Sequence, residues 1–193
     1  KRRKVLVTMH RRESRGEVLE RVCRTLLELV GRNPEVEVVF PVHRSPFVRE
    51  TVHRLLGGNV RIKLLEPLGY RELVRMLDAC HFVLTDSGGL QEEAPALGKP
   101  VLVLRETTER PEAVEAGTSR LVGTDPAGVL AAAETLLRDE RAYRAMGRAR
   151  ISYGDGLAAR RVAGALRFYF GLSDEPPVPF APAGPDLAGE GAA

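Results

Sequence analysis

Short apolar runs rich in β-branched residues alternate with longer amphipathic stretches along this chain of 193 residues. The short runs predict strands, and the stretches with apolar residues at helical spacing predict helices. The expected strands are Val5–Met9, Val36–Pro41, Arg61–Leu65, Phe82–Thr85, Val101–Leu104 and Arg120–Val122, and the expected helices are Glu17–Val30, Pro46–Leu56, Tyr70–Ala79, Leu90–Leu97, Pro126–Arg138 and Ala158–Phe170. Strands that are apolar throughout, with helices between them, predict an α/β fold in which helices cover both faces of a parallel sheet.

The composition changes near residue 171, where Pro, Ala, Gly and Asp begin to dominate. Such a segment buries too little apolar area to offset its ordering entropy. We therefore expect one folded domain over residues 1–170 and a disordered tail over residues 171–193. The chain also starts at Lys1 rather than Met and enters a predicted strand almost at once, which indicates a fragment or a processed piece of a longer protein.

The bulk composition excludes several classes of protein. Hydrophobic residues make up 44% of the chain, which supports a real core, and the net charge of +3 is mild. Aromatic residues make up only 5% and do not alternate with basic ones, so nucleic acid is not an expected partner. No apolar stretch reaches membrane-spanning length and no signal peptide precedes the first strand, so no membrane partner is expected either.

The two cysteines, Cys23 and Cys80, form neither a disulfide framework nor a metal motif. Each falls on the apolar side of a helical pattern, which predicts buried free thiols in a reducing compartment. We therefore expect a cytoplasmic protein. The sequence contains no recognisable metal cluster and no Ser-His-Asp or Cys-His arrangement.

Polar and cationic residues follow nearly every predicted strand. The segments concerned are His10–Glu13, His43–Ser45, Glu66–Tyr70, Asp86–Gly89 and Arg105–Arg110. In parallel α/β folds, ligands gather at the carboxyl ends of the strands. These segments therefore predict that one edge of the domain binds an anion.

The segment Thr85–Ala94 carries the strongest single signal. An apolar strand ends there in an acidic, hydroxyl and glycine turn, and a helical pattern opens at Leu90. Free backbone N–H groups and the positive end of a helix favour a phosphate, and glycines allow it a close approach. Two carboxylates follow within one turn and are suited to accept from sugar hydroxyls. The residues expected to meet such a sugar nucleotide are Ser87, Gly88, Gly89, Glu92 and Glu93.

Two histidines follow predicted strands. His10 is expected either to donate to a phosphate or to transfer a proton, in preference to being a solvated loop histidine. For His43 two interpretations are equally supported: a second anion contact together with Arg11, or a residue that shapes the turn before a helix.

Arg110 offers a planar guanidinium that matches phosphate oxygens. The competing interpretation is a surface salt bridge to Glu106 or Glu109, which its position at the polar edge makes the weaker one. The first strand is followed by Met9–Glu13, which contains no glycine. This disfavours a dinucleotide cofactor such as NAD bound in the usual place.

Several motifs together resemble one family. They are His10–Ser14, Pro41–His43, Thr85–Pro95, Gly98–Val101, Thr107–Ala113, Gly117–Thr118, Leu121–Asp125 and Tyr153–Gly156. In order and spacing, from about residue 4 to 170, they closely resemble the non-hydrolysing bacterial UDP-N-acetylglucosamine 2-epimerases. The resemblance implies the carboxy-terminal half of a two-domain glycosyltransferase-B-type fold, with a Rossmann-like domain that holds UDP beside the cleft between the halves.

The resemblance also implies site residues. For UDP these are Ser87, Gly88 and Gly89 at the diphosphate, Glu93 at the ribose hydroxyls, Arg110 and His10 at the phosphates, and Leu68 and the segment through Leu73 along the uracil. His10 is the one residue expected to be catalytic. Arg11 and His43 match residues that touch a second, activating UDP-N-acetylglucosamine.

The implied reaction inverts C2 of UDP-N-acetylglucosamine to give UDP-N-acetylmannosamine for cell-envelope polysaccharides. It runs by loss of the C2 proton with elimination of UDP and then re-addition, and it needs no cofactor and no metal. The acids that move the proton are expected in the amino-terminal half, so this chain by itself is expected to be inactive. A homodimer is expected for the full enzyme. The alternatives are a non-catalytic module that binds nucleotide sugars and the donor half of a glycosyltransferase.

Overall fold

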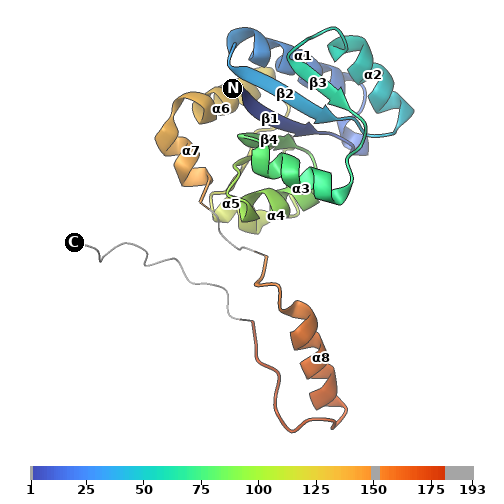
Figure 1. The fold of residues 1–193 in the computed structure, drawn as a ribbon, viewed down its shortest axis with the longest axis vertical. Coiled ribbons are helices and arrows are strands. Elements are labelled where there is room, and N and C mark those ends of the chain that lie inside the picture. The colour runs from blue at the N-terminus through green and yellow to red at the C-terminus, as the bar shows by residue number, and fades with distance from the viewer. Residues whose placement is uncertain (1, 149–152, 181–193) are drawn as a thin grey trace, which may run out of the picture. The chain divides into compact units, whose positions relative to one another are not determined.

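Six strands form one parallel sheet in the order β3-β2-β1-β4-β5-β6 (Figure 1). The computed structural model describes residues 2–148 and 153–180. The strands are β1 (Arg3–Thr8), β2 (Val36–Pro41), β3 (Ile62–Leu65), β4 (Phe82–Thr85), β5 (Val101–Val103) and β6 (Ser119–Leu121). The strand order reverses between the adjacent strands β1 and β4. Ligands of such sheets bind at this reversal, outside the carboxyl ends of the strands.

Helices connect the strands and cover both faces of the sheet. They are α1 (Glu17–Arg32), α2 (Pro46–Leu56), α3 (Tyr70–Ala79), α4 (Gly88–Ala96), α5 (Pro111–Glu115), α6 (Pro126–Arg138) and α7 (Glu140–Met146), with a short 3-10 helix, η1 (Arg12–Ser14). Residues of α1, α2 and α6 pack on one face and residues of α3 and α4 on the other. The predicted Rossmann-like sheet with helices on both faces is confirmed.

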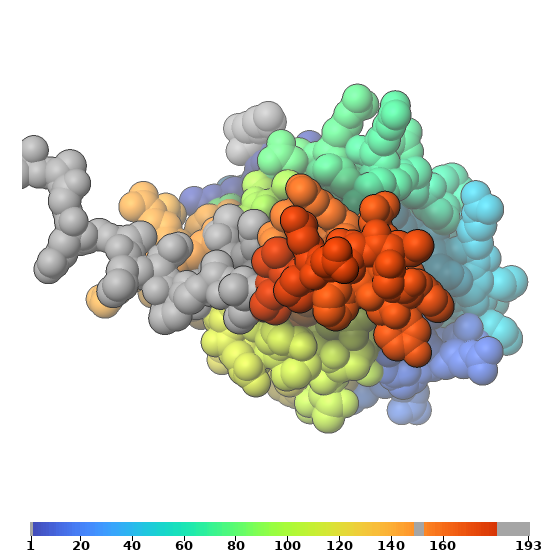
Figure 2. All heavy atoms as spheres, turned by 90° about the horizontal axis from the view of Figure 1, so that it is seen from below, coloured from blue at the N-terminus to red at the C-terminus, as the bar shows by residue number. Residues whose placement is uncertain are grey.

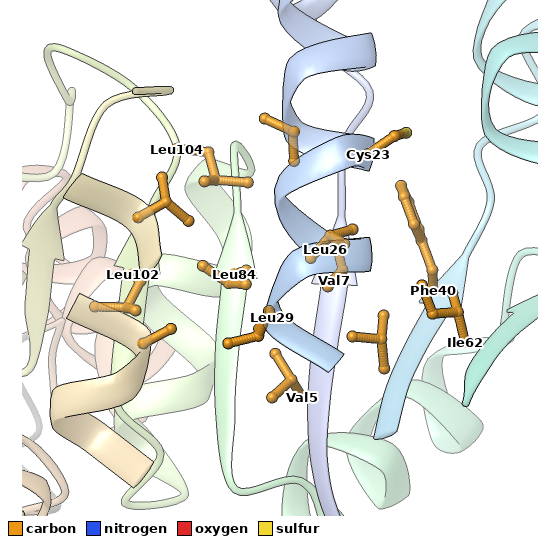
Figure 3. Packing of buried hydrophobic residues seen from close by; sticks show 14 of the residues in the cluster. Val5, Val7, Cys23, Leu26, Leu29, Phe40, Ile62, Leu84, Leu102 and Leu104 are labelled. Carbon is orange, nitrogen blue, oxygen red and sulfur yellow. The ribbon is translucent and has the colours of Figure 1, made fainter. Parts of the chain in front are cut away.

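Alternating side chains of the strands β1, β4 and β5 enter two separate cores. Val5 and Val7 of β1 join the larger core, whereas Leu6 between them joins the smaller one. Figure 3 shows Leu26 and Leu29 of α1 directed toward the strands of the larger core. Both faces of the sheet exclude water, which explains why the strands are apolar at consecutive positions and not at every second one.

The register of the two central strands decides where the polar loops lie. Thr8 pairs with Thr85 at the carboxyl ends of β1 and β4. Their hydroxyl oxygens lie 2.6 Å apart, so the two strands end at the same level. The loops that begin after Thr8 and Thr85 are consequently side by side, and both contain predicted site residues.

One predicted helix needs a corrected start, and one helix was missed. Helix α4 begins at Gly88 and not at Leu90, so both glycines belong to its first turn. Helix α7 was not predicted, because none of its residues is fully buried and its apolar pattern is short. Tyr143 holds α7 in place: its hydroxyl donates to the backbone carbonyl of His81 at 2.9 Å, and its ring stacks on the His81 ring at 4.2 Å.

The chain divides into two units, Lys1–Arg150 and Ile151–Ala193. In the second unit, α8 (Ala158–Tyr169) leaves apolar side chains exposed, and residues 172–180 contain no helix or strand. The described atoms of this unit are coloured orange to red in Figure 2. The exposed apolar residues of this helix and its C-cap include Val162, Leu166, Phe168, Tyr169 and Phe170. The predicted domain boundary at residue 170 and the predicted disorder of 171–193 stay predictions, and residues 181–193 lie outside the described part.

Both cysteines are buried free thiols, as predicted. Burial raises the pKa of Cys23 and that of Cys80 to about 12, so both thiols stay protonated and inert. Among residues 2–148 and 153–180, no helix is both long and apolar enough to cross a membrane.

The larger core yields a stability prediction. Phe40 is fully buried in β2, so Phe40→Ala removes a ring from a close-packed site and leaves a cavity. We expect the free energy of unfolding to fall by about 3–5 kcal/mol, measured by urea denaturation. The matched control is Phe47→Ala on α2, where the ring is 68% exposed. The control should cost no more than about 1 kcal/mol, and similar losses for the two variants would contradict this account of the core.

Candidate functional site

The first turn of α4 presents backbone N–H groups at the carboxyl edge of the sheet. Ser87 is the N-cap residue, but its side chain makes no capping hydrogen bond. Gly88 and Gly89 are the first two helical residues and add no side chains above these N–H groups. Uncapped N–H groups and the positive end of a helix together favour an anion. The phosphate site predicted from the sequence therefore coincides with the start of the helix itself and not with a turn before it.

Asp86 connects the ends of β4 and β1 beneath this turn. Its carboxylate is fully buried, and Oδ2 accepts hydrogen bonds from the backbone N–H groups of His10 and Arg11, both at 3.0 Å. Oδ1 lies 3.1 Å from Nδ1 of the His10 ring. Arg11 donates from Nε to the backbone carbonyl of Asp86 at 2.8 Å. The loop after β1 is thus tied to the loop after β4 by side chain and backbone together.

The charged forms of His10 and Asp86 stabilise each other. Burial alone would raise the pKa of Asp86, but hydrogen bonds from the His10 ring and from the two backbone N–H groups hold that pKa below its usual range. The same hydrogen bond raises the pKa of His10 above its usual value, despite partial burial of the ring. The contact therefore favours the protonated form of His10 and the ionised form of Asp86.

His43 lies at the same edge as His10. The two ring centroids are 6.0 Å apart. Nδ1 of His43 accepts a hydrogen bond from the backbone N–H of Ser45 at 3.1 Å, which shapes the turn before α2. This contact matches the turn-shaping interpretation of His43, and it leaves the ring exposed beside His10.

Three arginines at this edge, Arg11, Arg105 and Arg110, are paired with carboxylates of the chain. Arg11 and Arg105 both form ion pairs with Glu109. Arg105 also lies 3.3 Å from Glu13. The cationic edge predicted from the sequence is therefore internally neutralised to a large extent.

Arg110 is held at the start of α5. It forms an ion pair with Glu92 of α4 and donates from Nη1 to the backbone carbonyl of Glu109 at 3.0 Å. This pairing carries the Arg110 guanidinium to the side of α4, near the first turn. Because Glu92 is paired with Arg110, its carboxylate is not available to a sugar hydroxyl.

Gln91 fastens the loop after β5 to α4. It is fully buried, and its side chain donates to the backbone carbonyl of Ser87 at 3.1 Å. Its carbonyl oxygen accepts from the hydroxyl of Thr108 at 2.6 Å, and that hydroxyl oxygen accepts from the backbone N–H of Arg110 at 3.0 Å. The position of Arg110 thus depends on a buried amide that the sequence did not mark.

Glu93 lies on the first turns of α4 with one carboxylate oxygen unsatisfied. Oε2 is buried and has no hydrogen-bond partner among the described residues. A Cβ placed on Gly89 would lie 3.7 Å from Oε1 of Glu93 and 3.9 Å from the Ser87 hydroxyl, so all three groups share one site. Burial, and then the charge of Glu92, raise the pKa of Glu93. An unpartnered buried acceptor is suited to a hydroxyl donor from a ligand.

The two predicted uracil residues belong to the segment that follows β3. Leu68 is half-buried in the loop between β3 and α3, and Leu73 of α3 packs its side chain against the smaller core. Within residues 2–148 and 153–180, no group of three or more His, Cys, Asp and Glu side chains is arranged to hold a metal ion.

The structure thus brings most predicted site residues to one edge. These are His10, Arg11, His43, Ser87, Gly88, Gly89, Glu93 and Arg110. Sequence reasoning assigned no role to four residues that the site depends on: Asp86, Gln91, Arg105 and Glu109. A signal existed for Asp86 and Arg105, because each follows a strand closely, and for Gln91, which is a polar residue on the buried side of a helix.

Fold and site together define a Rossmann-like domain whose carboxyl edge brings His10 and His43 beside the uncapped start of α4. The model of the UDP-N-acetylglucosamine 2-epimerase family matches residues 1–167, and the chain belongs to that family. The match confirms the resemblance that the motifs indicated. It also agrees with the region over which those motifs extend.

Individual relatives agree with the family match. A curated protein from Ralstonia solanacearum, described as a probable UDP-N-acetylglucosamine 2-epimerase, is 57% identical over 169 residues, which cover 88% of this chain and 45% of the relative. The S. aureus MnaA–UDP co-structure superposes with a TM-score of 0.89 at 42% identity, over 93% of this chain and 49% of that one. The UDP-GlcNAc 2-epimerase from Neisseria meningitidis, bound to UDP-GlcNAc, gives 0.83 at 41% identity, over 86% and 44%.

The chain spans about half the length of the curated relatives it matches. The predicted fold, one half of a glycosyltransferase-B-type pair of domains, is confirmed by this partial coverage of the solved epimerase structures.

Proposed function

We propose that this chain is the UDP-binding half of a non-hydrolysing UDP-N-acetylglucosamine 2-epimerase. In this proposal, the diphosphate lies at the first turn of α4 against Ser87, Gly88 and Gly89. His10 and Arg110 contact the phosphates, and Glu93 accepts from the ribose hydroxyls. The solved relatives that carry UDP or UDP-GlcNAc support this proposal, since they share the fold at more than 40% identity.

One observation carries the proposal: the uncapped first turn of α4 stands beside a buried carboxylate oxygen of Glu93 that has no partner. A phosphate satisfies the N–H groups, and a sugar hydroxyl satisfies the carboxylate. Only a ligand with both groups a few ångströms apart meets the two needs at once. A nucleoside diphosphate has this combination.

The position of these donors around the diphosphate also supports a role for the carboxyl edge of the sheet in the reaction. Elimination converts the bound diphosphate into a leaving anion that must be retained for re-addition. Donors prearranged around the diphosphate stabilise charge as it develops there. His10, whose pKa is raised, is suited to supply a proton or a positive charge to that anion.

The groups that move the C2 proton are proposed to lie outside this chain. Among the described carboxylates at the site, Glu13, Glu92 and Glu109 are paired with arginines and Asp86 is held by His10, which leaves Glu93. The relatives extend over about twice this length. We therefore propose that the remaining half of the enzyme supplies the acids and closes the cleft.

Further parts of the proposal follow the family resemblance. The uracil lies along the segment Leu68–Leu73, and a second UDP-GlcNAc binds near Arg11 and His43 as an activator. The full enzyme works as a homodimer in the cytoplasm. The buried free thiols are consistent with a reducing compartment.

The first test concerns Arg110. Arg110→Ala removes a charge-assisted contact to the phosphates, so we expect UDP binding to weaken by roughly 1.5–3 kcal/mol in titration calorimetry. The matched control is Arg24→Ala on α1, which removes another arginine that is paired with a glutamate, Glu20, at 3.3 Å. Equal UDP affinity for Arg110→Ala and the parent chain would remove Arg110 from the site.

The second test concerns catalysis by the chain alone. Incubated with UDP-N-acetylglucosamine in D2O, the chain should produce no exchange of the C2 proton, because the described site lacks an unpaired acid positioned for it apart from Glu93. Proton NMR measures the exchange, and the full-length Bacillus subtilis relative serves as the positive control. Exchange catalysed by the isolated chain would show that the proton-transfer groups lie within it.

A further inference from the structure

Asp86 is the most deeply placed charge of the site. Its side chain is fully buried at the end of β4, and its acceptor positions are used by the backbone N–H groups of His10 and Arg11 and by Nδ1 of His10. A buried carboxylate is costly unless such donors surround it. A carboxylate at this buried position indicates a role that an apolar residue could not fill.

The contact with His10 gives the imidazole ring a direction. Nδ1 is held by Asp86, and the ring remains 43% exposed, so Nε2 is the nitrogen available to a ligand at the edge. In a neutral histidine, the nitrogen that faces a carboxylate carries the proton. Asp86 thus selects the tautomer with hydrogen on Nδ1, or holds the ring doubly protonated.

Other charged groups around His10 act in opposite directions. Arg11 lowers the pKa of His10 and Glu13 raises it, both less than Asp86 does. His43, which follows β2, is the remaining titratable ring nearby, at 6.0 Å between centroids. The Asp86 contact is therefore the dominant favourable influence on the charge of His10.

We propose that Asp86 is a positioning residue: it orients His10 so that a charged Nε2–H group faces the diphosphate. The ligand in this proposal rests on the proposed function, whereas the tautomer and charge of the His10 ring do not depend on it. Asp86→Asn is the suitable variant, because an amide oxygen keeps an acceptor for the backbone N–H groups while the negative charge is lost.

Nitrogen-15 NMR of the histidine rings tests the proposal directly. In the parent chain, we expect His10 to titrate above its usual value and to become the Nδ1–H tautomer when neutral. In Asp86→Asn, its pKa should fall, while that of His81, lowered by burial far from this site, should not move. Asp78→Asn on the exposed surface of α3 is the matched control.

UDP affinity supplies the functional measurement. His10 adds affinity when protonated, so this contribution is present below its pKa and is lost as pH rises through it. In Asp86→Asn the loss should occur at lower pH, with affinity at pH near 7.5 reduced roughly 10-fold. UDP itself titrates equally in both series, so the difference reports the protein.

Each outcome decides one proposal. An Nε2–H tautomer or an unraised pKa of His10 in the parent chain would overturn the role of Asp86, even if the variant failed to fold. A parent chain that binds no UDP would overturn the proposed function, whereas the tautomer and the pKa would still decide the role of Asp86.

A separate observation concerns Glu109. A Cβ placed on Gly88 would lie 2.9 Å from Oε1 of Glu109 and 3.6 Å from Nη2 of Arg11. Hydrogen bonds from Arg105, and then from Arg11, lower the pKa of Glu109 to about 2, so the carboxylate is ionised. An anion of the chain itself therefore lies against the first turn of α4.

We infer that Glu109 lies at the diphosphate position and must leave when UDP binds. This inference rests on the proposed function. The phosphate then replaces Glu109 both at the helix terminus and beside Arg11. Any anion that binds at Gly88 has its affinity reduced by the free energy needed to displace Glu109.

Glu109→Gln tests this competition. The variant keeps the size of the side chain but weakens its hold on the arginines, so UDP should bind roughly 10-fold more tightly by calorimetry. The matched control is Glu13→Gln, which also loses a partner of Arg105 but has no contact with Gly88. We expect the control to change affinity much less.

Measurable UDP binding by the parent chain, left unchanged or weakened in Glu109→Gln, would overturn the competition and leave the proposed function standing. Equal gains in Glu109→Gln and Glu13→Gln would also overturn it, since they would reflect net charge alone. An absence of UDP binding to all three chains would overturn both.

Discussion

The site depends on one buried carboxylate. Asp86 accepts hydrogen bonds from the backbone of the loop after β1 while its own backbone continues β4, so the two central loops are held at one level. The glycine turn of α4, the His10 ring and the Arg11 guanidinium all take their positions from this connection. Because burial of an unpaired carboxylate would be costly, the connection also penalises any arrangement in which the loops separate.

Charge compensation is the second constraint on this edge. Arg11, Arg105 and Arg110 form ion pairs with Glu109 and Glu92. The edge therefore attracts anions less strongly than its arginines suggest, and a ligand must exchange with the carboxylates of the chain. Under the proposed function, such exchange makes the affinity for a diphosphate depend on the difference between two sets of ion pairs.

Much of the fold was predictable because its signals are local. Strand β2 and helices α2, α3 and α6 have the predicted bounds, since apolar runs, prolines at helix starts and glycines at helix ends act within a few residues. Helix α7 was missed because its stability comes from Tyr143 stacking on His81, a partner distant in the chain. The start of α4 was misplaced by two residues because glycine has poor helix propensity, which the tertiary position of the turn overrides.

By itself, the sequence determined the class of fold, the family and the edge at which the candidate site residues gather. Each follows from periodicity, or from motifs whose residues stand close together in the chain. Only the tertiary structure decided which charges meet. That Asp86 holds His10, that Glu109 lies on Gly88 and that Glu93 keeps an unpartnered oxygen depend on distances between separate loops. Strand register and helix packing fix those distances, and no local pattern in the sequence encodes them.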